Sequence, residues 1–258
     1  MNERILYDKC PLCDCPTLID SVTGNCSNHP LYHSSLSAEM RWKKCTNCAH
    51  IFIEGYYTDD ACRLIFSRTN EKQQVGFDVE RQRITSSHMV EKVLPYVTEG
   101  YWLDVGFGNG SLLFTAQEYG FVPIGVDLRV DSVNKMASLG IECFCKDITE
   151  LYLNSKCSVI SMANVLEHMP YPKNALRAAC RLLSDEGVLL ISMPNIESVV
   201  WKALDQNNDN PYWGEMEHCH NFSRKRLYGL LREVGFEPVR YGISVRYRSC
   251  MEVIAKKI

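Results

Sequence analysis

Residues 103–111 read Leu-Asp-Val-Gly-Phe-Gly-Asn-Gly-Ser. An apolar run, YWLDV, ends inside this stretch, and a segment of helical period begins at its last residue. Glycines at alternate positions, Gly106, Gly108 and Gly110, permit a tight turn and let a ligand approach the backbone closely. The N-terminus of the following helix favours a negatively charged group. We therefore predict a strand, a glycine turn and a helix, with a ligand site at the turn.

Short apolar runs alternate with helix-period segments from Tyr101 to the end of the chain. Seven runs are candidate strands: YWLDV, VPIGVD, IECFC, CSVISMA, GVLLISMP, FEPVRYG and YRSCMEVIA. Helices are predicted over 111–119, 131–139, 172–183 and from Ser223 to Gly235. Apolar strands joined by crossover helices predict an α/β fold with a Rossmann-like, mostly parallel seven-stranded sheet and flanking helices. Such a sheet binds its ligand at the carboxyl ends of its strands.

Acidic residues end three of the candidate strands. Asp104 precedes the glycine turn, Asp127 ends the second strand and Asp147 follows the third. A strand-end carboxylate can accept hydrogen bonds from two ribose hydroxyls, although one such aspartate can instead cap a helix. The dinucleotide fingerprint G-x-G-x-x-G is not matched because residue 111 is Ser, and an acid two residues before the first glycine suits a positive amino group. Together these residues predict a nucleoside site.

The motifs LDVGFGNGS, GVD, CKDI and NVLEHMPYP occur in the order found in one family. On these motifs, residues 84–258 resemble class I S-adenosylmethionine-dependent methyltransferases. The resemblance implies that the cofactor is S-adenosylmethionine. It also implies that the methionine end of the cofactor binds at Asp104, Gly106, Gly108 and Gly110. It further implies that Asp127 binds the ribose, that Asp147 and Ile148 border the adenine, and that Asn164 lines the cleft.

Cysteines are concentrated in the first quarter of the chain. Two C-x-x-C pairs, Cys10 with Cys13 and Cys45 with Cys48, each predict a knuckle with two thiolates. Two knuckles complete a tetrahedral shell for a structural Zn²⁺ with no open position. Cys15, Cys26, His29, His33 or His50 could replace one ligand. The predicted organisation is a zinc-ribbon-like module over 1–60, a linker with a connecting helix over 61–83, and a methyltransferase domain over 84–258.

Composition narrows the class of protein further. The net charge of −3 argues against nonspecific nucleic-acid binding, and no stretch approaches the ~20 apolar residues of a membrane span. The first residues, MNERILYDKCP, lack the apolar core of a signal peptide, so a cytoplasmic protein is expected. The zinc module could act as a lid, form a homodimer contact or contact the substrate.

Three histidines are candidate proton acceptors for the methyl-transfer reaction: His168, His218 and His220. His168 lies just past the fourth predicted strand, and the other two lie in an insertion over 194–222 whose Trp201, Tyr212 and Trp213 could wall a substrate pocket. Some relatives that methylate quinone precursors bind a divalent metal through an E-x-x-E-H cluster. In this chain Asn164 replaces the first acid of that cluster.

The whole chain also resembles bacterial methyltransferases with an N-terminal zinc ribbon, many of which modify sugars, lipids or other small metabolites; the segment PYWGEMEHCHNFS is similar to theirs. The expected activity is therefore methylation of a small metabolite, with O-methylation favoured. One alternative is RNA or protein methylation with the ribbon recognising the macromolecule. Another is a non-catalytic scaffold that retains the cofactor fold.

Overall fold

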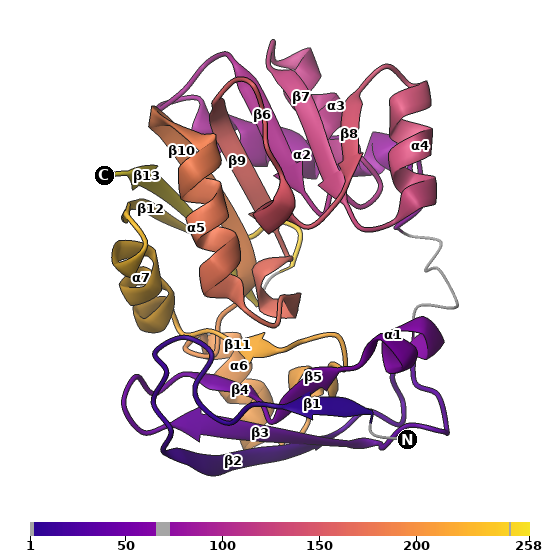
Figure 1. Cartoon of the computed structure of the whole chain (residues 1–258), viewed down its shortest axis with the longest axis vertical. Coiled ribbons are helices and arrows are strands. Elements are labelled where there is room, and N and C mark those ends of the chain that lie inside the picture. Colours follow the sequence, from indigo (N-terminus) through magenta and orange to yellow (C-terminus); the bar gives the residue numbers. More distant parts are fainter. Residues whose placement is uncertain (1–2, 66–72, 248) are drawn as a thin grey trace. The chain divides into compact units, whose positions relative to one another are not determined.

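The computed structural model describes residues 3–65, 73–247 and 249–258. The chain forms two compact units (Figure 1). Unit 1 comprises Met1–Thr69, Glu167–Lys173 and Pro194–Leu230, and unit 2 comprises Asn70–Leu166, Asn174–Met193 and Leu231–Ile258. In the described part of the chain, no helix has the length and apolar character needed to cross a membrane.

Unit 2 is built on a seven-stranded sheet with the order β12-β13-β10-β9-β6-β7-β8. Its strands are β6 (Tyr101–Val105), β7 (Val122–Asp127), β8 (Glu142–Cys145), β9 (Cys157–Ala163), β10 (Leu183–Pro194), β12 (Phe236–Ile243) and β13 (Cys250–Lys257). Pairing from β10 through β9, β6 and β7 to β8 is parallel, and β12 pairs antiparallel with β13. This confirms the predicted mostly parallel α/β sheet.

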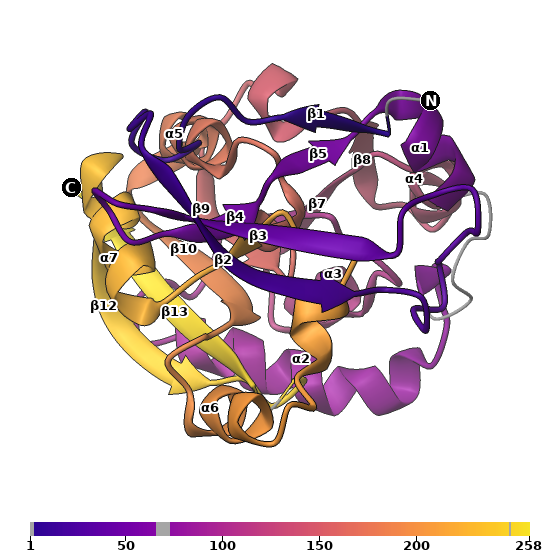
Figure 2. The ribbon, with the colours of Figure 1, turned by 90° about the horizontal axis from the view of Figure 1, so that it is seen from below.

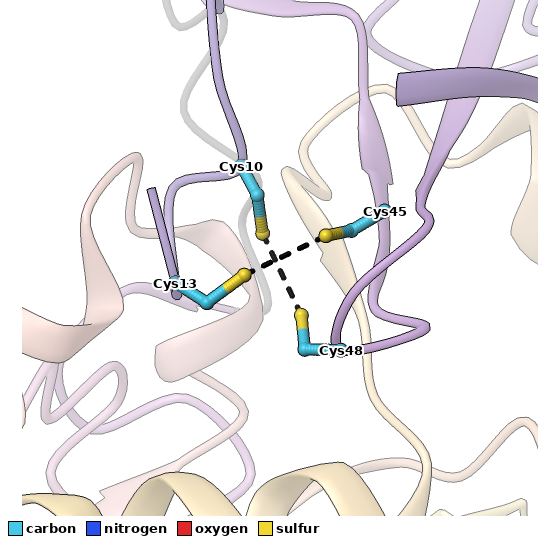
Figure 3. Close-up of side chains that lie close together, drawn as sticks. All are labelled: Cys10, Cys13, Cys45 and Cys48. Carbon is cyan, nitrogen blue, oxygen red and sulfur yellow. Dashed lines mark hydrogen bonds between the residues drawn. The ribbon is translucent and has the colours of Figure 1, made fainter. Parts of the chain in front are cut away.

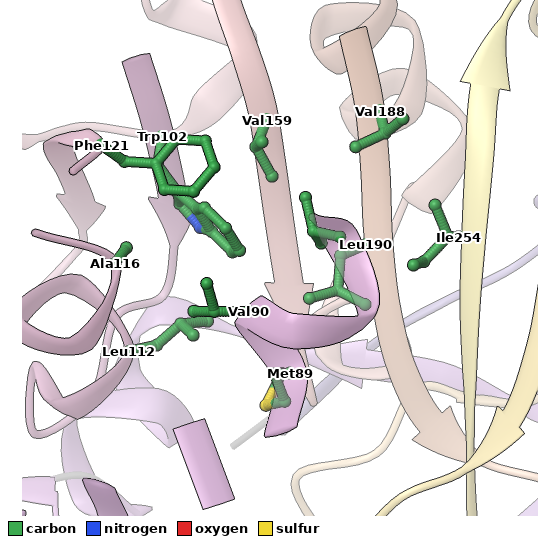
Figure 4. Close-up of a cluster of buried hydrophobic side chains, with 11 residues drawn as sticks. Met89, Val90, Trp102, Leu112, Ala116, Phe121, Val159, Val188, Leu190 and Ile254 are labelled. Carbon is green, nitrogen blue, oxygen red and sulfur yellow. The ribbon is translucent and has the colours of Figure 1, made fainter. Parts of the chain in front are cut away.

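Helices cover both faces of this sheet, with α5 on one face and α2 and α3 on the other (Figure 1). The helices of unit 2 are α2 (Val79–Val93), α3 (Ser111–Glu118), α4 (Val130–Ser138) and α5 (Pro172–Leu182), whereas α7 (Arg224–Glu233) begins in unit 1 and ends in unit 2. Figure 4 shows the core in which Val90 of α2 and Leu112 of α3 pack against the sheet residues Trp102 and Val159. The strands carry apolar side chains on both faces of the sheet, and the apolar stripe of each helix packs against one of these faces.

The candidate strand IECFC forms β8, which is the edge strand of the sheet, and its Cys145 is exposed. The end residues Glu142 and Cys145 are exposed, whereas Cys143 and Phe144 between them are partly buried. The predicted linker over 61–83 includes residues 66–72, which lie outside the described residues, and α2 begins within it at Val79.

Unit 1 contains the two cysteine pairs and a small antiparallel sheet with the order β11-β4-β3-β2. Figure 2 shows β2, β3 and β4 of this sheet. The elements of unit 1 are β1 (Arg4–Leu6), β2 (Leu18–Asn25), β3 (Glu39–Cys45), β4 (Ile51–Ile53), β5 (Gly55–Tyr57), α1 (Asp59–Ile65), α6 (Val199–Gln206) and β11 (His220–Asn221). The pair His220–Phe52 aligns β11 with β4. The insertion therefore supplies a strand to the N-terminal sheet, a long-range pairing that no local sequence pattern indicated.

The hydrophobic core of unit 1 also draws on both parts of the chain. Trp42 and Ile53 of the N-terminal strands pack with Met216 and Cys219 of the insertion. The unit thus extends beyond the module predicted over 1–60, because a core of about sixty residues buries too little apolar surface to be stable without help.

Candidate active site

The glycine turn has the backbone that its sequence predicts. Gly106, Gly108 and Gly110 adopt left-handed φ values of 66°, 56° and 82° between β6 and α3. A Cβ at Gly106 would lie 2.8 Å from Val165 Cγ2, and one at Gly110 would lie 2.8 Å from Met136 Sδ. A Cβ at Gly108 would meet nothing within 4 Å. Gly106 and Gly110 are thus needed for packing, whereas the free space at Gly108 suits the close approach of a ligand.

Asp104, the penultimate residue of β6, is a buried carboxylate, 4% exposed. Ser161 Oγ donates a hydrogen bond to Asp104 Oδ1 at 2.6 Å, and Trp102 Nε1 donates to that hydroxyl at 2.8 Å. Burial raises the pKa of Asp104 to about 7, although the Ser161 hydrogen bond and the charge of Arg246 favour ionisation. A positively charged ligand group at this carboxylate would replace the missing solvation and stabilise its ionised form.

Asp127 ends β7 beside a cation that the sequence reading missed. Arg129 donates from Nη2 to Asp127 Oδ2 at 2.7 Å and from Nε to Oδ1 at 2.9 Å. The same guanidinium donates to the carbonyl oxygens of Gly108 at 3.3 Å and Gln73 at 3.0 Å. The carboxylate predicted to bind the ribose is therefore already paired, and its partner also braces the glycine turn. A basic residue two positions after a strand-end aspartate was the available signal.

The remaining residues predicted for the cofactor lie after β8 and β9. Asp147 accepts hydrogen bonds from Thr149 N at 2.8 Å and Thr149 Oγ1 at 2.6 Å, which makes it the N-cap of the short helix η2 (Ile148–Glu150). Ile148 is buried. Asn164 has a left-handed φ of 58°, and its backbone N–H donates to Ser192 O at 2.8 Å. All residues predicted for the cofactor thus belong to unit 2.

The four cysteines of the two pairs converge in unit 1 (Figure 3). Cys10 Sγ and Cys48 Sγ lie 3.7 Å apart, and Cys13 Sγ and Cys45 Sγ lie 3.5 Å apart. A Zn–S bond of about 2.3 Å places tetrahedral sulfurs roughly 3.8 Å apart, so the arrangement fits a zinc ion.

The backbone of the two pairs supports the same interpretation. The residue after each second cysteine is left-handed, Asp14 with φ 57° and Ala49 with φ 58°. Their amides donate to the carbonyls of Cys10 and Cys45, so each pair closes the predicted knuckle. Cys15, Cys26, His29, His33 and His50 are not in this group of four.

The three candidate histidines all belong to unit 1 and fall into two environments. The ring centroids of His168 and His218 lie 4.8 Å apart, whereas His220 Nδ1 lies 2.9 Å from His50 Nε2. Burial lowers the pKa of His218 to about 3, reinforced by the charge of His168, and lowers that of His220 to about 4. Both rings are therefore neutral at neutral pH, and His168 is the more accessible of the three.

The aromatic residues of the insertion pack against one another within unit 1. The ring of Trp201 stacks on Tyr212 with centroids 5.0 Å apart and meets Trp213 edge-on at 5.2 Å. Trp42 Nε1 donates to Trp213 O at 2.9 Å, and Trp201 is 1% exposed. Trp201 is thus a core residue of unit 1, not the wall of a pocket. The expectation had missed this role because aromatic residues serve cores and pockets equally well.

Two solved structures with a similar fold carry methyltransferase names. Magnesium protoporphyrin IX methyltransferase from Synechocystis PCC 6803, with bound SAH, aligns with a TM-score of 0.56 at 18% identity, covering 72% of this chain and 89% of the other. The 1,6-didemethyltoxoflavin-N1-methyltransferase of Burkholderia thailandensis, with S-adenosylhomocysteine, aligns with a TM-score of 0.54 at 18% identity, covering 70% and 82%. At 18% identity, these two structures show that the fold is similar and nothing more.

Sequence comparison assigns a family to most of the chain. The chain carries a methyltransferase domain. The family model described as a methyltransferase domain matches residues 77–241, and the chain belongs to this family.

Two relatives share part of this region. The ubiquinone biosynthesis O-methyltransferase of Glaesserella parasuis serovar 5 (strain SH0165) is 28% identical over 106 residues, 36% of this chain and 44% of that protein. The protein of the same name from Histophilus somni (strain 2336) is 29% identical over 121 residues, 42% of this chain and 50% of that protein. The matched region thus spans about half the length of each relative.

Proposed function

We propose that this enzyme transfers a methyl group from S-adenosylmethionine to a hydroxyl oxygen of a small metabolite. In this reaction the acceptor oxygen forms a bond to the methyl carbon, the sulfonium sulfur keeps the electron pair of the broken bond, and the hydroxyl proton leaves. The protein must hold the acceptor in line with the methyl group and promote loss of the proton.

The observation that carries the proposal is the cluster of Glu167, His168 and His218, whose side-chain donor atoms lie within 4.8 Å of one another. We assign loss of the acceptor proton to this cluster. His220, whose ring pairs with His50, lies outside this cluster. The names of two relatives, ubiquinone biosynthesis O-methyltransferases, favour oxygen as the acceptor atom.

The cofactor sites follow from unit 2. We propose that the methionine end binds at Asp104 and the glycine turn, that Asp127 accepts the ribose hydroxyls, and that Asp147 and Ile148 border the adenine, with Asn164 nearby. A strand-end carboxylate set beside a glycine turn matches the positive amino group and the hydroxyls of this cofactor.

The four cysteines of unit 1 would hold a zinc ion that stabilises the fold and takes no part in the chemistry. The thirteen free cysteines are compatible with the reducing conditions of the cytoplasm.

A label-transfer experiment tests the proposed acceptor. The purified enzyme is incubated with methyl-labelled S-adenosylmethionine and a cell extract, and label is measured in the small-molecule, protein and RNA fractions. The control variants are Asp104→Asn, which should lose transfer, and Asp131→Asn, an exposed acid outside the predicted site, which should keep it. Label in the small-molecule fraction on an ether oxygen supports the proposal. Label in RNA or protein overturns it, as does saturable cofactor binding without transfer to any fraction.

A further inference from the structure

Two segments far apart in the chain are joined around the histidine cluster of unit 1. The turn after β9 contributes Glu167 and His168 from the short helix η3 (Leu166–His168), and the insertion contributes His218. Cys219 N donates to Glu167 O at 2.8 Å, and Cys219 Sγ lies 3.4 Å from His168 O. The three side chains are therefore held by backbone contacts on both sides.

The imidazole of His168 is oriented for ligation. Its Nδ1 lies 3.0 Å from the carbonyl oxygen of Glu217, which can only accept, so Nδ1 carries the proton. The lone pair of the neutral ring is then on Nε2. A histidine that donates one ring N–H to a backbone carbonyl and presents the other nitrogen is the usual arrangement of a metal ligand, because the hydrogen bond fixes both tautomer and ring orientation.

His218 gives an independent sign of a missing partner. Its ring is 7% exposed, and its Nδ1 has no hydrogen-bond partner among the described residues. A buried polar nitrogen without a partner costs free energy, typically about 1–3 kcal/mol, unless a ligand satisfies it. The ring faces His168 edge-on. His218 thus belongs to a buried cluster of two imidazoles and one carboxylate.

We propose that Glu167, His168 and His218 bind a divalent first-row transition-metal ion. Two imidazoles and one carboxylate suit Zn²⁺, Mn²⁺, Fe²⁺ or Co²⁺, whereas Mg²⁺ and Ca²⁺ favour oxygen ligands alone. Three protein ligands leave coordination positions open, unlike the four cysteines. The donor set also differs from the E-x-x-E-H cluster that Asn164 interrupts, because the insertion supplies one of the ligands.

This inference rests on the proposed function and deepens it. An acceptor hydroxyl bound at an open position would lose its proton more readily, since a divalent cation lowers the pKa of a coordinated oxygen. The histidines would then promote proton loss as metal ligands instead of accepting the proton themselves.

Cobalt titration of the metal-free full-length chain tests the site without cofactor or acceptor. Cobalt in a four-thiolate site gives strong sulfur-to-metal charge-transfer absorption, whereas a site of two histidines and a carboxylate gives only weak d–d bands. The expected result is about two bound equivalents, one with each signature. Glu167→Gln and His218→Ala should each weaken the second site at least about 100-fold, because the loss of a direct ligand exceeds the 10–100-fold cost of losing an outer-shell partner.

His33→Ala provides the matched control, because His33 is an exposed histidine of the same unit outside the cluster. This variant should keep both spectra, and an unchanged charge-transfer band in the other variants shows that unit 1 is still folded. The proposal is overturned if cobalt binding saturates without the weak d–d bands of a second site that has no sulfur ligand. It is also overturned if the second site still binds cobalt with unchanged affinity in both Glu167→Gln and His218→Ala. If no second ion binds but labelled methyl groups still reach a small molecule, the metal site is refuted while the proposed function stands.

Discussion

The guanidinium of Arg129 bonds both carboxylate oxygens of Asp127, at 2.9 and 2.7 Å. Asp127 is the residue assigned to the ribose hydroxyls, so the free protein already satisfies the carboxylate that the cofactor needs. Carboxylate oxygens have several lone pairs, and ribose hydroxyls can donate to those that Arg129 leaves available. The pair thus keeps a buried charge compensated until the cofactor binds.

Substitution of Arg129 should expose this role. Arg129→Ala leaves the Asp127 carboxylate, 7% exposed, without its cation, and the free protein should lose about 2 kcal/mol of unfolding free energy. S-adenosylmethionine would supply hydroxyl donors in compensation, so its addition should raise the melting temperature more in the variant than in the wild type. Thermal melts with and without cofactor measure both effects. Arg83→Ala, which removes an exposed pair with Glu118, should change neither by a comparable amount. An equal cofactor-induced shift in Arg129→Ala and the wild type would contradict this role.

Asp104 should make stability depend on pH. Its pKa is raised to about 7 in the folded protein by burial, against about 3.9 in the unfolded chain. The folded state therefore binds the proton more tightly, so this contribution is complete below about pH 4 and is lost as pH rises through 7. At 1.36 kcal/mol per pKa unit, the loss is about 4 kcal/mol.

Asp104→Asn should remove most of this pH dependence in the free protein. The variant should be more stable than the wild type at pH 8 yet bind S-adenosylmethionine more weakly, because an amide does not offer a full negative charge to the amino group. Denaturant titrations at several pH values and calorimetric binding measure the two properties. A wild-type unfolding free energy that does not fall between pH 5 and pH 8, relative to the variant, would refute the assignment.

Two glycines of the turn should respond differently to alanine. Gly106→Ala places a Cβ 2.8 Å from Val165 Cγ2 and should lower the melting temperature markedly. Gly108→Ala meets no atom within 4 Å, so its stability cost should be limited to the left-handed backbone, about 1–2 kcal/mol. Cofactor affinity should nevertheless fall at least tenfold in Gly108→Ala. Calorimetry and thermal melts separate the effects, and full affinity in Gly108→Ala would place the cofactor elsewhere.

Removal of the predicted zinc should unfold unit 1. Cys13→Ser should bind less than about half an equivalent of zinc and lose the near-ultraviolet dichroism of the Trp42, Trp201 and Trp213 cluster, because metal binding supplies folding free energy to so small a module. Cys145→Ser, at an exposed thiol of unit 2, serves as control and should retain zinc and spectrum. Elemental analysis measures the zinc content of the wild type and of both variants. A wild-type protein free of zinc and still folded in unit 1 would exclude a structural metal.

Much of unit 2 could be predicted from sequence because its signals are local. The run YWLDV, the glycines after it and the helix from Ser111 are contiguous, and each strand-end aspartate follows its own strand. The knuckles of unit 1 are local as well, since Cys10 and Cys13 lie in a single turn. In these places the spacing of residues along the chain specifies the local conformation directly.

The sequence by itself therefore determined the parallel sheet, the glycine turn and the two cysteine pairs, because short-range periodicity and turn chemistry carry that information. Only the tertiary structure decided that β11 completes the N-terminal sheet, that Arg129 holds Asp127, and that His218 joins Glu167 and His168. Strand pairing and side-chain clusters bring together residues separated by many others, and their choice of partner depends on the packing of the whole core. For the same reason, no local motif could show that Trp201 and Trp213 pack in the core of unit 1.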